Sequence, residues 1–379
     1  MKNLTVIGEV FVDINNKGTV NRSVNEILIS YARHFNSVHY IGPGDREITM
    51  EKGLKDKILI STITDYNKSL KNRLRYYIRY NKVKKRYKDL LKESDIVQIR
   101  IPSLFSIGAY PVVKSLKLPL TTYIAGDWLN SFNANYKFRG SKYIANRLER
   151  MQHPIIKNSI PVTAGPILAD KYSKINKCHA YYSTTHNKVY NKKHIIKPHN
   201  IIFVGRLEPL KRVEDAIKSI EILLRRSIDV KLTILGDGFM RKQLENMVGE
   251  MKLEEHVLFK GNISDKDIVK EEYLKADILL LPSLSEGTPK VLAEAMAHSV
   301  VPIAVEDVGS NDYIIQNGVN GILVPKRSPE SIADSIMNLV ENIEIYSDMV
   351  HYSQKYALEH TLDNEVDKLW DFVFQSIKI

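Results

Sequence analysis

Two glutamates stand eight positions apart in the stretch SLSEGTPKVLAEAMA, residues 283–297. The apolar run DILLLPS comes just before them and predicts a buried strand. Pro289 suits the start of a helix, because its fixed φ and its missing N–H are tolerated there. Glu286 therefore falls in a strand-to-helix loop, and Glu294 falls in the helix that follows.

The loop between these glutamates is a predicted anion site. The backbone N–H groups of Gly287, Thr288 and the following turn point toward an incoming anion, helped by the helix dipole. The carboxylates of Glu286 and Glu294 accept hydrogen bonds from hydroxyl groups. A nucleoside diphosphate sugar matches this order of groups, since its diphosphate lies between sugar and ribose hydroxyls. The alternative is that both glutamates are ordinary residues of a helix start and a solvated helix.

A second candidate site follows the strand in FVGRLEPLKR. Arg206 and Lys211 lie close after the strand end, where two cations can clamp a diphosphate. They would also stabilise the charge that builds on a leaving diphosphate. The alternative is that both are solvated loop cations. Further on, Asn262 lies in the post-strand turn KGNIS, where main-chain atoms can receive a nucleotide base.

Strands and helices alternate along the chain and must position these residues. Apolar runs predict strands at 4–8, 37–44, 95–102 and 120–127, and a new series starts at 200–207. Strands separated by helices indicate α/β domains with parallel sheets. We predict two Rossmann-like, doubly wound domains that face each other across a cleft. The first spans residues 1–190, the second spans 191–345, and 346–379 form helices that can pack back on the first.

Composition fits this organisation. The chain has 379 residues, which suggests two domains at about 100–200 residues each. Its single cysteine, Cys178, excludes a disulfide framework within the chain and fits a reducing compartment. No apolar run reaches the ~18–20 residues that a bilayer span needs. The start, MKNLTVIGEV, has no pattern of a signal peptide. We therefore expect a cytoplasmic protein.

The net charge of +11 is concentrated in one stretch. Residues 66–93 hold eleven Lys and Arg against two acids, with tyrosines between them. Cations attract anionic lipid headgroups, and tyrosine rings suit the membrane interface, so this stretch predicts contact with an anionic membrane surface. A solvated helix is the alternative. Common RNA-binding signatures are missing, and we expect no nucleic acid partner.

Several motifs together resemble one known family. VGRLEPLK, ILGDG, VLFKGN, ADILLLPS, SEGTPKVLAEAMA and DVGS follow one another between residues 200 and 325. They look like the donor domain of GT-B glycosyltransferases, and above all of the large retaining family four, the "glycosyltransferase group 1" type. The resemblance implies a nucleotide-sugar donor, an interdomain cleft and transfer with retention at the anomeric carbon. It implies no cofactor and no metal.

The resemblance also assigns roles to residues. Arg206 and Lys211 would bind the diphosphate, Glu286 would contact the transferred sugar, and Glu294 would hold the ribose. Residues 287–289 would present amides to phosphate and sugar. In the first domain, Gly18 would let the loop after the first strand approach the diphosphate. Asp127 stands where many members have a histidine, and would touch donor sugar or acceptor.

These expectations lead to one predicted function and two alternative functions. We expect transfer of a hexose-type sugar from a nucleoside diphosphate to a glycan or lipid-linked acceptor, in polysaccharide or glycoconjugate synthesis. The protein would lie in the cytoplasm, or peripherally on the inner face of the membrane. A nucleotide-sugar epimerase of the same fold stays open as an alternative. So does a non-enzymatic, basic protein that binds RNA or membranes.

Overall fold

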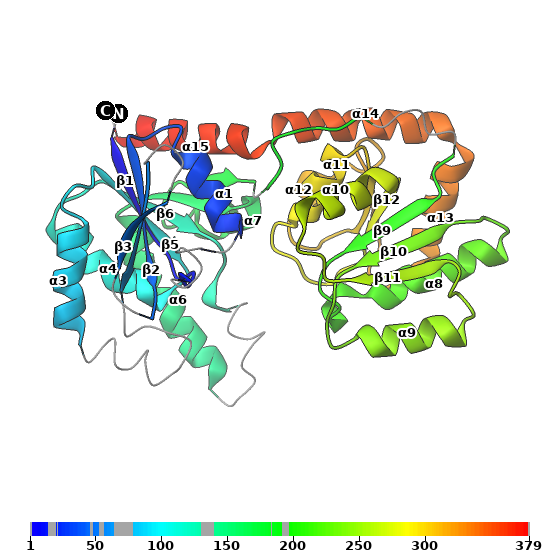
Figure 1. The fold of residues 1–379 in the computed structure, drawn as a ribbon, viewed down its shortest axis with the longest axis horizontal. Helices are drawn as coiled ribbons and strands as arrows, with labels where there is room; N and C mark the ends of the chain where they lie inside the picture. The colour runs from blue at the N-terminus through cyan, green and yellow to red at the C-terminus, as the bar shows by residue number, and fades with distance from the viewer. Residues whose placement is uncertain are drawn as a thin grey trace. The chain divides into compact units, whose positions relative to one another are not determined.

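The chain forms two compact units, each with its own sheet (Figure 1). The computed structural model describes residues 2–13, 20, 22–45, 48–52, 57–63, 79–129, 140–182, 184–191 and 197–377. The first unit comprises Met1–Tyr182 and Leu362–Ile379, and the second comprises Ser183–Thr361. The second unit is therefore continuous in sequence, whereas the first is made from both ends of the chain.

The first unit contains an eight-stranded sheet in the order β3-β4-β2-β1-β5-β6-β7-β8. Its strands are β1 (Asn3–Ile7), β2 (Ser37–Pro43), β3 (Thr49–Lys52), β4 (Ile58–Ile63), β5 (Ile96–Ile101), β6 (Leu120–Ile124), β7 (Ile160–Ala164) and β8 (His179–Tyr181). Neighbouring strands are parallel, except that β3 pairs antiparallel with β4 at the edge. The central strands are buried on both faces, as a parallel sheet between helices requires.

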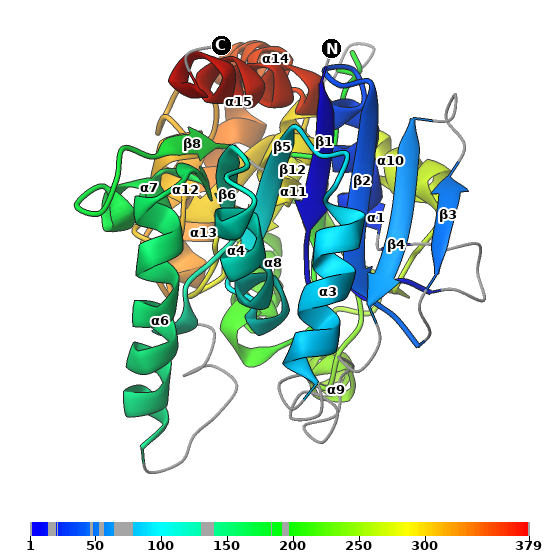
Figure 2. The same cartoon turned by 90° about the vertical axis from the view of Figure 1, so that its left-hand side faces the viewer.

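Helices cover both faces of this sheet. They are α1 (Arg22–Tyr31), α3 (Tyr80–Leu90), α4 (Leu104–Ser115), α6 (Ser141–Lys157), α7 (Pro166–Tyr172) and α15 (Leu362–Ile377). Successive strand residues point to opposite faces, so Val6 lies in one apolar core and Ile7 in another. Residues of α1 and α15 complete the core around Val6. Figure 2 shows α3, α4 and α6 together in front of the sheet.

The last helix, α15, is held to the first unit by an aromatic side chain. Trp370 is fully buried. Its ring centroid lies 5.0 Å from that of Tyr31 and 4.6 Å from that of Phe35, in edge-to-face geometry. Such pairs add stabilisation beyond the buried area itself. The end of the chain thus supplies part of the core whose other part comes from its beginning.

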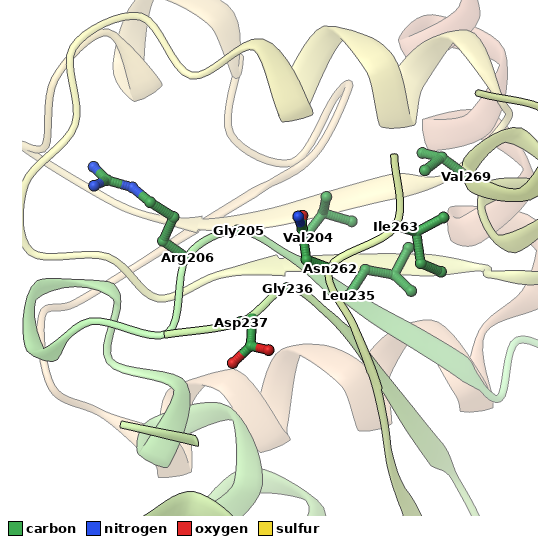
Figure 3. A pocket seen from close by; sticks show the side chains of 9 residues that line it. All are labelled: Val204, Gly205, Arg206, Leu235, Gly236, Asp237, Asn262, Ile263 and Val269. Carbon is green, nitrogen blue, oxygen red and sulfur yellow. The ribbon is translucent and has the colours of Figure 1, made fainter. Parts of the chain in front are cut away.

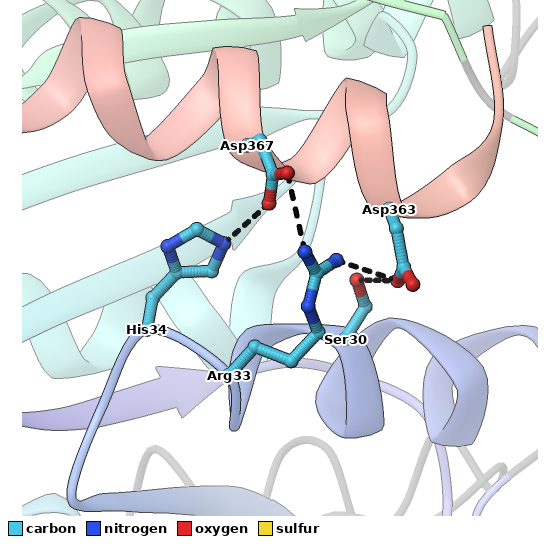
Figure 4. Close-up of polar contacts among 5 residues, drawn as sticks. All are labelled: Ser30, Arg33, His34, Asp363 and Asp367. Atoms are coloured by element: carbon cyan, nitrogen blue, oxygen red, sulfur yellow. Dashed lines mark hydrogen bonds and ion pairs between the residues drawn. The ribbon is translucent and has the colours of Figure 1, made fainter.

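Ion pairs line the rim of the same contact (Figure 4). Arg33 pairs with Asp363 at 2.9 Å and with Asp367 at 3.2 Å, and His34 Nε2 lies 2.8 Å from Asp367 Oδ1. Ser30 donates a hydrogen bond to Asp363. Because these charged side chains are partly exposed, water screens their attraction, and each pair contributes little beside the buried rings.

The second unit has the strand order of a dinucleotide-binding fold. Its six-stranded sheet runs β11-β10-β9-β12-β13-β14, and its neighbouring strands are parallel. The strands are β9 (Asn200–Val204), β10 (Lys231–Leu235), β11 (Val257–Gly261), β12 (Ile278–Leu281), β13 (Val301–Val305) and β14 (Ile322–Val324). Chain order therefore reverses between β9 and β12. In such sheets ligands bind outside the carboxyl ends of the strands, at this switch point.

The helices of the second unit follow its strands in turn. They are η1 (Pro209–Lys211), α8 (Val213–Arg225), α9 (Arg241–Glu250), α10 (Lys266–Lys275), α11 (Lys290–Ala297), α12 (Asn311–Ile314), α13 (Pro329–Glu341) and α14 (Ile343–Glu359). Ser328 caps α13 by accepting from the N–H of Ser331, and Pro329 stands at the first helical position. The prediction of α/β, Rossmann-like units is confirmed. In the described part of the chain, no helix has the length and apolar composition of a bilayer span.

Candidate active site

Three loops interlock at the carboxyl ends of β9, β10 and β11. A Cβ on Gly236 would stand 1.8 Å from the carbonyl oxygen of Gly205, and the φ of Gly236 is +147°. Only glycine tolerates that combination. The N–H of Leu207 donates to Asp237 at 2.9 Å, and the N–H of Gly236 donates to Gly261 at 2.8 Å. Backbone contacts, rather than side chains, therefore set the shape of this edge of the sheet.

A pocket of about 470 Å³ opens between these loops (Figure 3). Its lining comprises Val204, Gly205, Arg206, Leu235, Gly236, Asp237, Asn262, Ile263 and Val269. Two predicted site residues, Arg206 and Asn262, are thus brought to one pocket. Figure 3 shows Arg206 at one end and Val269 at the other. The pocket offers a cation at one end and aliphatic side chains at the other, which suits a ligand with an anionic and a planar, less polar part.

Arg206 reaches into solvent. Its side chain is 76% exposed, and its Nη1 lies 2.7 Å from Glu208 Oε1. An exposed pair of this kind holds together weakly. The guanidinium can therefore leave Glu208 for a phosphate at small cost.

Lys211 and Glu286 meet across the switch point of the sheet. Lys211 ends η1 after β9, and Glu286 lies in the loop after β12. The Nζ and Oε1 atoms lie 2.6 Å apart, with side-chain exposures of 20% and 10%. The N–H of Leu284 donates to the carbonyl of Leu210 at 2.8 Å, which fixes the two loops to each other. A charge-assisted hydrogen bond in this protected place is stronger than a surface pair.

The helix after this loop starts one residue later than predicted. Pro289 precedes α11 with ψ at 106°, an extended conformation, and Lys290 is the first helical residue. Gly287 accepts a hydrogen bond from the N–H of Ser310, and a Cβ on Gly287 would meet nothing within 4 Å. Thr288 Oγ1 lies 3.3 Å from Ser310 Oγ. The loop is therefore supported from the DVGS turn and leaves open space beside Gly287.

Glu294 accepts hydrogen bonds from two protein hydroxyls. Thr185 Oγ1 donates to Oε1, and the hydroxyl of Tyr273 donates to Oε2 at 3.4 Å. Thr185 lies in the segment before β9, and Tyr273 lies on α10. The sequence did not predict the contacts of Thr185 and Tyr273 with Glu294, because the residues around them show no pattern that indicates a contact with α11. The carboxylate is thus held in place by groups of the same kind as a ribose hydroxyl.

His298 packs beneath this network. Its ring stacks between those of Tyr190 and Tyr273, at centroid distances of 4.7 Å and 5.1 Å. Its Nδ1 lies 2.7 Å from the backbone carbonyl of Glu294. Burial lowers the pKa of His298, so the ring is neutral near pH 7.

The remaining predicted residues belong to the first unit. Asp127 follows β6 and is 5% exposed. Its Oδ2 lies 3.3 Å from Lys171 Nζ, which also lies 3.1 Å from Glu149 Oε1. Tyr172 donates to Glu149 at 2.6 Å. Asp127 is therefore one member of a buried polar cluster. Gly18 lies outside the described residues.

No metal site accompanies these groups in the described ranges. Within them, no set of three or more His, Cys, Asp or Glu side chains could hold a metal ion.

Comparison with known proteins finds a family match within the second unit and relatives that cover part of the chain. Residues 187–356 match the family described as glycosyl transferases group 1. The uncharacterized glycosyltransferase MJ1607 of Methanocaldococcus jannaschii is 34% identical over 165 residues, which are 43% of this chain and 42% of that protein. Protein CapJ of Staphylococcus aureus is 29% identical over 276 residues, 70% of this chain and 68% of that protein. The chain thus spans less than half of MJ1607.

A solved structure is similar over the whole chain. The crystal structure of Anabaena Alr3699/HepE in complex with UDP has a TM-score of 0.72 at 13% identity, and the comparison covers 99% of this chain and 100% of that one. This similarity confirms the GT-B fold class. The family match rests on the same residues that carry the motifs and the pocket. Residues 187–356, most of the second unit, thus match the family of group 1 glycosyl transferases.

Proposed function

We propose that this chain transfers a hexose-type sugar from a nucleoside diphosphate to a glycan or lipid-linked acceptor. The observation that carries the proposal is the Lys211–Glu286 contact at the switch point of the second sheet. A cation and a carboxylate stand there together, where a parallel sheet of this order binds its ligand. The nearby pocket adds Arg206. HepE, which is similar in fold, was solved with UDP and with UDP-glucose, and this supports a nucleotide-sugar donor.

The residues divide the chemistry between them. Arg206, Lys211 and the start of α11 stabilise the diphosphate as the bond between its oxygen and the anomeric carbon breaks. Lys211 leaves Glu286 for the diphosphate, and Glu286 then accepts from the hydroxyls of the sugar. The acceptor oxygen bonds to the anomeric carbon, and its proton passes to the leaving phosphate. Transfer on one face of the sugar gives retention and needs no metal.

The other candidate residues bind the substrates rather than stabilise the leaving group. Glu294 holds the ribose, Asn262 lies where the base enters, and residues 287–289 meet phosphate and sugar. Asp127 contacts donor sugar or acceptor from the first unit. We place the protein in the cytoplasm, peripherally on an anionic membrane through the basic stretch 66–93, of which residues 79–93 are described. Its product would enter polysaccharide or glycoconjugate synthesis.

Donor binding is the first test. A thermal-shift panel of UDP, GDP, ADP and their sugars should raise the melting temperature for one base, because a ligand that binds the native state stabilises it. Glu294→Ala should weaken that binding by about tenfold, the loss expected for one charge-assisted hydrogen bond. Arg206→Ala should depress turnover. If no nucleotide binds, or if both variants match the parent, the proposed site is wrong.

Product analysis separates transfer from the epimerase alternative. Incubation of the donor with a labelled acceptor pool should yield a glycosylated acceptor and free nucleoside diphosphate. A change in the sugar's configuration, with the nucleotide still attached, would favour an epimerase instead.

A further inference from the structure

The sheet of the first unit has a switch point of its own, and an arginine stands there. Chain order reverses between β1 and β5, which are neighbours in the sheet. Their pairing ends at Ile7 and Ile99, so Gly8 and Arg100 come next along the two strands. Sheets of this kind bind ligands outside the carboxyl ends of their strands, at the switch point. Arg100 therefore lies where we expect the first unit to bind a ligand.

The side chain of Arg100 packs against an aromatic ring. Its Cζ lies 4.3 Å from the ring centroid of Tyr123, and the residue is half-buried. A Cβ on Gly8 would stand 3.3 Å from Arg100 Cδ and 2.8 Å from the hydroxyl oxygen of Tyr40. The chain that leaves β1 thus passes close to the stem of the arginine. These contacts hold the guanidinium at the edge of the sheet.

The charge of Arg100 has no counter-charge in the described part of the chain. There, its guanidinium forms neither an ion pair nor a hydrogen bond. Burial raises the pKa of Tyr31 and of Tyr40, although the charge of Arg100 acts against that rise, so both hydroxyls stay neutral near pH 7. A partly desolvated cation without a partner gains from an incoming oxyanion. Guanidinium matches carboxylate and phosphate, because its parallel N–H groups bind both oxygens at once.

The next strand brings a carboxylate to the same edge. β5 and β6 pair in parallel, with Arg100 opposite Tyr123. Asp127 follows the end of β6, and Lys171 holds it by an ion pair at 3.3 Å. A carboxylate accepts hydrogen bonds from hydroxyl groups. The edge thus offers one group for an oxyanion and another for the hydroxyls of a sugar.

We propose that the acceptor of this chain is acidic, and that Arg100 binds its carboxylate or phosphoryl group through two parallel hydrogen bonds. The inference rests on the proposed transferase function and narrows the acceptor to one chemical class. The donor's diphosphate is the other oxyanion of that reaction. Arg206 and Lys211 already provide two cations for the diphosphate, so we assign Arg100 to the acceptor. A neutral acceptor would leave the arginine without a counter-charge.

Binding of small hexoses to the full chain, measured by ligand-observed NMR without a donor, tests the proposal. The probes are D-glucuronate, D-glucose 6-phosphate and neutral D-glucose. We expect the better of the two acids to bind about tenfold more tightly than glucose, as one bidentate, charge-assisted contact predicts. The acid that binds better identifies the oxyanion as carboxylate or phosphoryl. Equal binding of all three sugars would overturn the proposal.

Substitution of Arg100 assigns the preference to this residue. Arg100→Gln should abolish the preference for the acid. The matched control is Arg147→Gln, which removes the same charge from an exposed position on α6 and should keep the preference. Equal losses in the two variants would overturn the assignment, because they would reflect the net charge of the chain.

Arg100→Lys covers the case in which Arg100→Gln does not fold. Lysine keeps the charge and the stem but lacks the parallel N–H groups, so the preference for the acid should fall several-fold while the melting temperature stays near that of the parent. An unchanged preference in a folded Arg100→Lys would contradict bidentate binding.

Nucleotide binding separates this inference from the proposed function. In Arg100→Gln, the nucleotide found by thermal shift should raise the melting temperature as it does in the parent, while the KM for an acidic acceptor rises about tenfold. Lost nucleotide binding with an intact acid preference would assign Arg100 to the donor and overturn the inference. A chain that binds no nucleotide but prefers acids through Arg100 would contradict the transferase proposal and leave the anion site standing.

Discussion

Lys211 and Glu286 join two loops that are 75 positions apart in sequence. If the cation stabilises the leaving diphosphate, its loss should act on the rate more than on stability. We expect Lys211→Met to lower kcat by about 10²–10³-fold, the usual loss when one preorganised electrostatic group is removed. Steady-state kinetics with the donor found by thermal shift provide the measurement. Arg225→Met, which removes an exposed pair with Glu221, is the control, and Lys211→Met turnover within twofold of it would contradict the role.

The hydroxyl of Thr185 gives a sharper test of Glu294. Thr185→Val keeps the shape but removes the donor to Oε1, so the carboxylate loses its fixed position. We expect the parent to bind UDP, or the equivalent diphosphate, about tenfold better than its 2′- or 3′-deoxy analogue. The variant should lose most of this discrimination, and Thr185→Ser should restore it. Unchanged discrimination in Thr185→Val would show that Thr185 does not position Glu294.

Tyr273 provides a graded comparison in the same network. Its hydroxyl donates to Glu294 Oε2 at 3.4 Å, which is a longer and weaker hydrogen bond than the one from Thr185. Tyr273→Phe should therefore reduce the discrimination between the diphosphate and its deoxy analogue less than Thr185→Val does. The ring remains stacked on His298 in that variant, and the core should stay intact.

A partly buried histidine predicts how the first unit responds to acid. His39 of β2 lies 2.7 Å from Ser61 Oγ, and burial, aided by the charge of Arg86, lowers its pKa to about 4. The unfolded chain takes up that proton near pH 6.5, whereas the folded chain does so near pH 4. Stability from this group is therefore complete above pH 6.5 and is lost as the pH falls toward 4, by at most about 1.4 kcal/mol per pH unit.

Denaturant titrations between about pH 4 and 7 measure that loss. The parent's free energy of unfolding should fall more steeply over this window than that of His39→Gln, which has no proton to take up. Parallel curves for the two proteins would mean that His39 is not held neutral in the folded state.

At the scale of elements, the loops after β9 and β10 approach each other closely. Gly236→Ala would drive a Cβ into the carbonyl of Gly205, at a φ that alanine avoids. We expect a loss of about 3 kcal/mol or more in stability, or failure to fold, as for other strained backbone sites. Gly318→Ala is the matched control. It also has a positive φ, +77°, but open space around its Cβ, so it should cost about 1 kcal/mol. Equal losses would contradict the close approach.

The sequence was most informative where strands are almost wholly apolar. β12 and β13 are buried along their whole length, and their runs of Leu, Ile and Val predict them directly. Residues 141–181 were not assigned to elements. The strands there are mixed in composition, since β7 includes Pro161 and Thr163 and β8 has only three residues. The buried face of α6 carries Glu149 and Gln152, which breaks the apolar period.

In the candidate site, too, the sequence predicts some features and not others. The motif places Glu286 and Glu294 on either side of a helix start, and local spacing is enough for that. The partner of Glu286 is Lys211, and the partners of Glu294 are Thr185 and Tyr273. These contacts join segments far apart in sequence, and only the strand order brings them together, so spacing along the chain cannot predict them.

At the scale of the whole molecule, we expect α15 to be needed for the stability of the first unit but not for that of the second. Deleting residues 362–379 removes Leu362, Val366, Leu369, Trp370 and Val373 from its core. Loss of several large core side chains exceeds the stability of most domains. We expect the first unit to unfold or aggregate, while the second unit keeps its nucleotide binding in a thermal-shift assay. A fully folded first unit, seen as unchanged amide exchange in β1 and β2, would contradict this.

The first unit is built from two separate segments of the chain, and this constrains the order in which the two units can fold during synthesis. Residues 183–361 are contiguous, so the second unit can fold as soon as it leaves the ribosome. The sheet of the first unit is synthesised earlier, but α15 is synthesised only after the whole second unit. Until then, the apolar surface around Tyr31 and Phe35 stays uncovered. The nascent amino-terminal half is therefore the stage at which chaperones have most to protect.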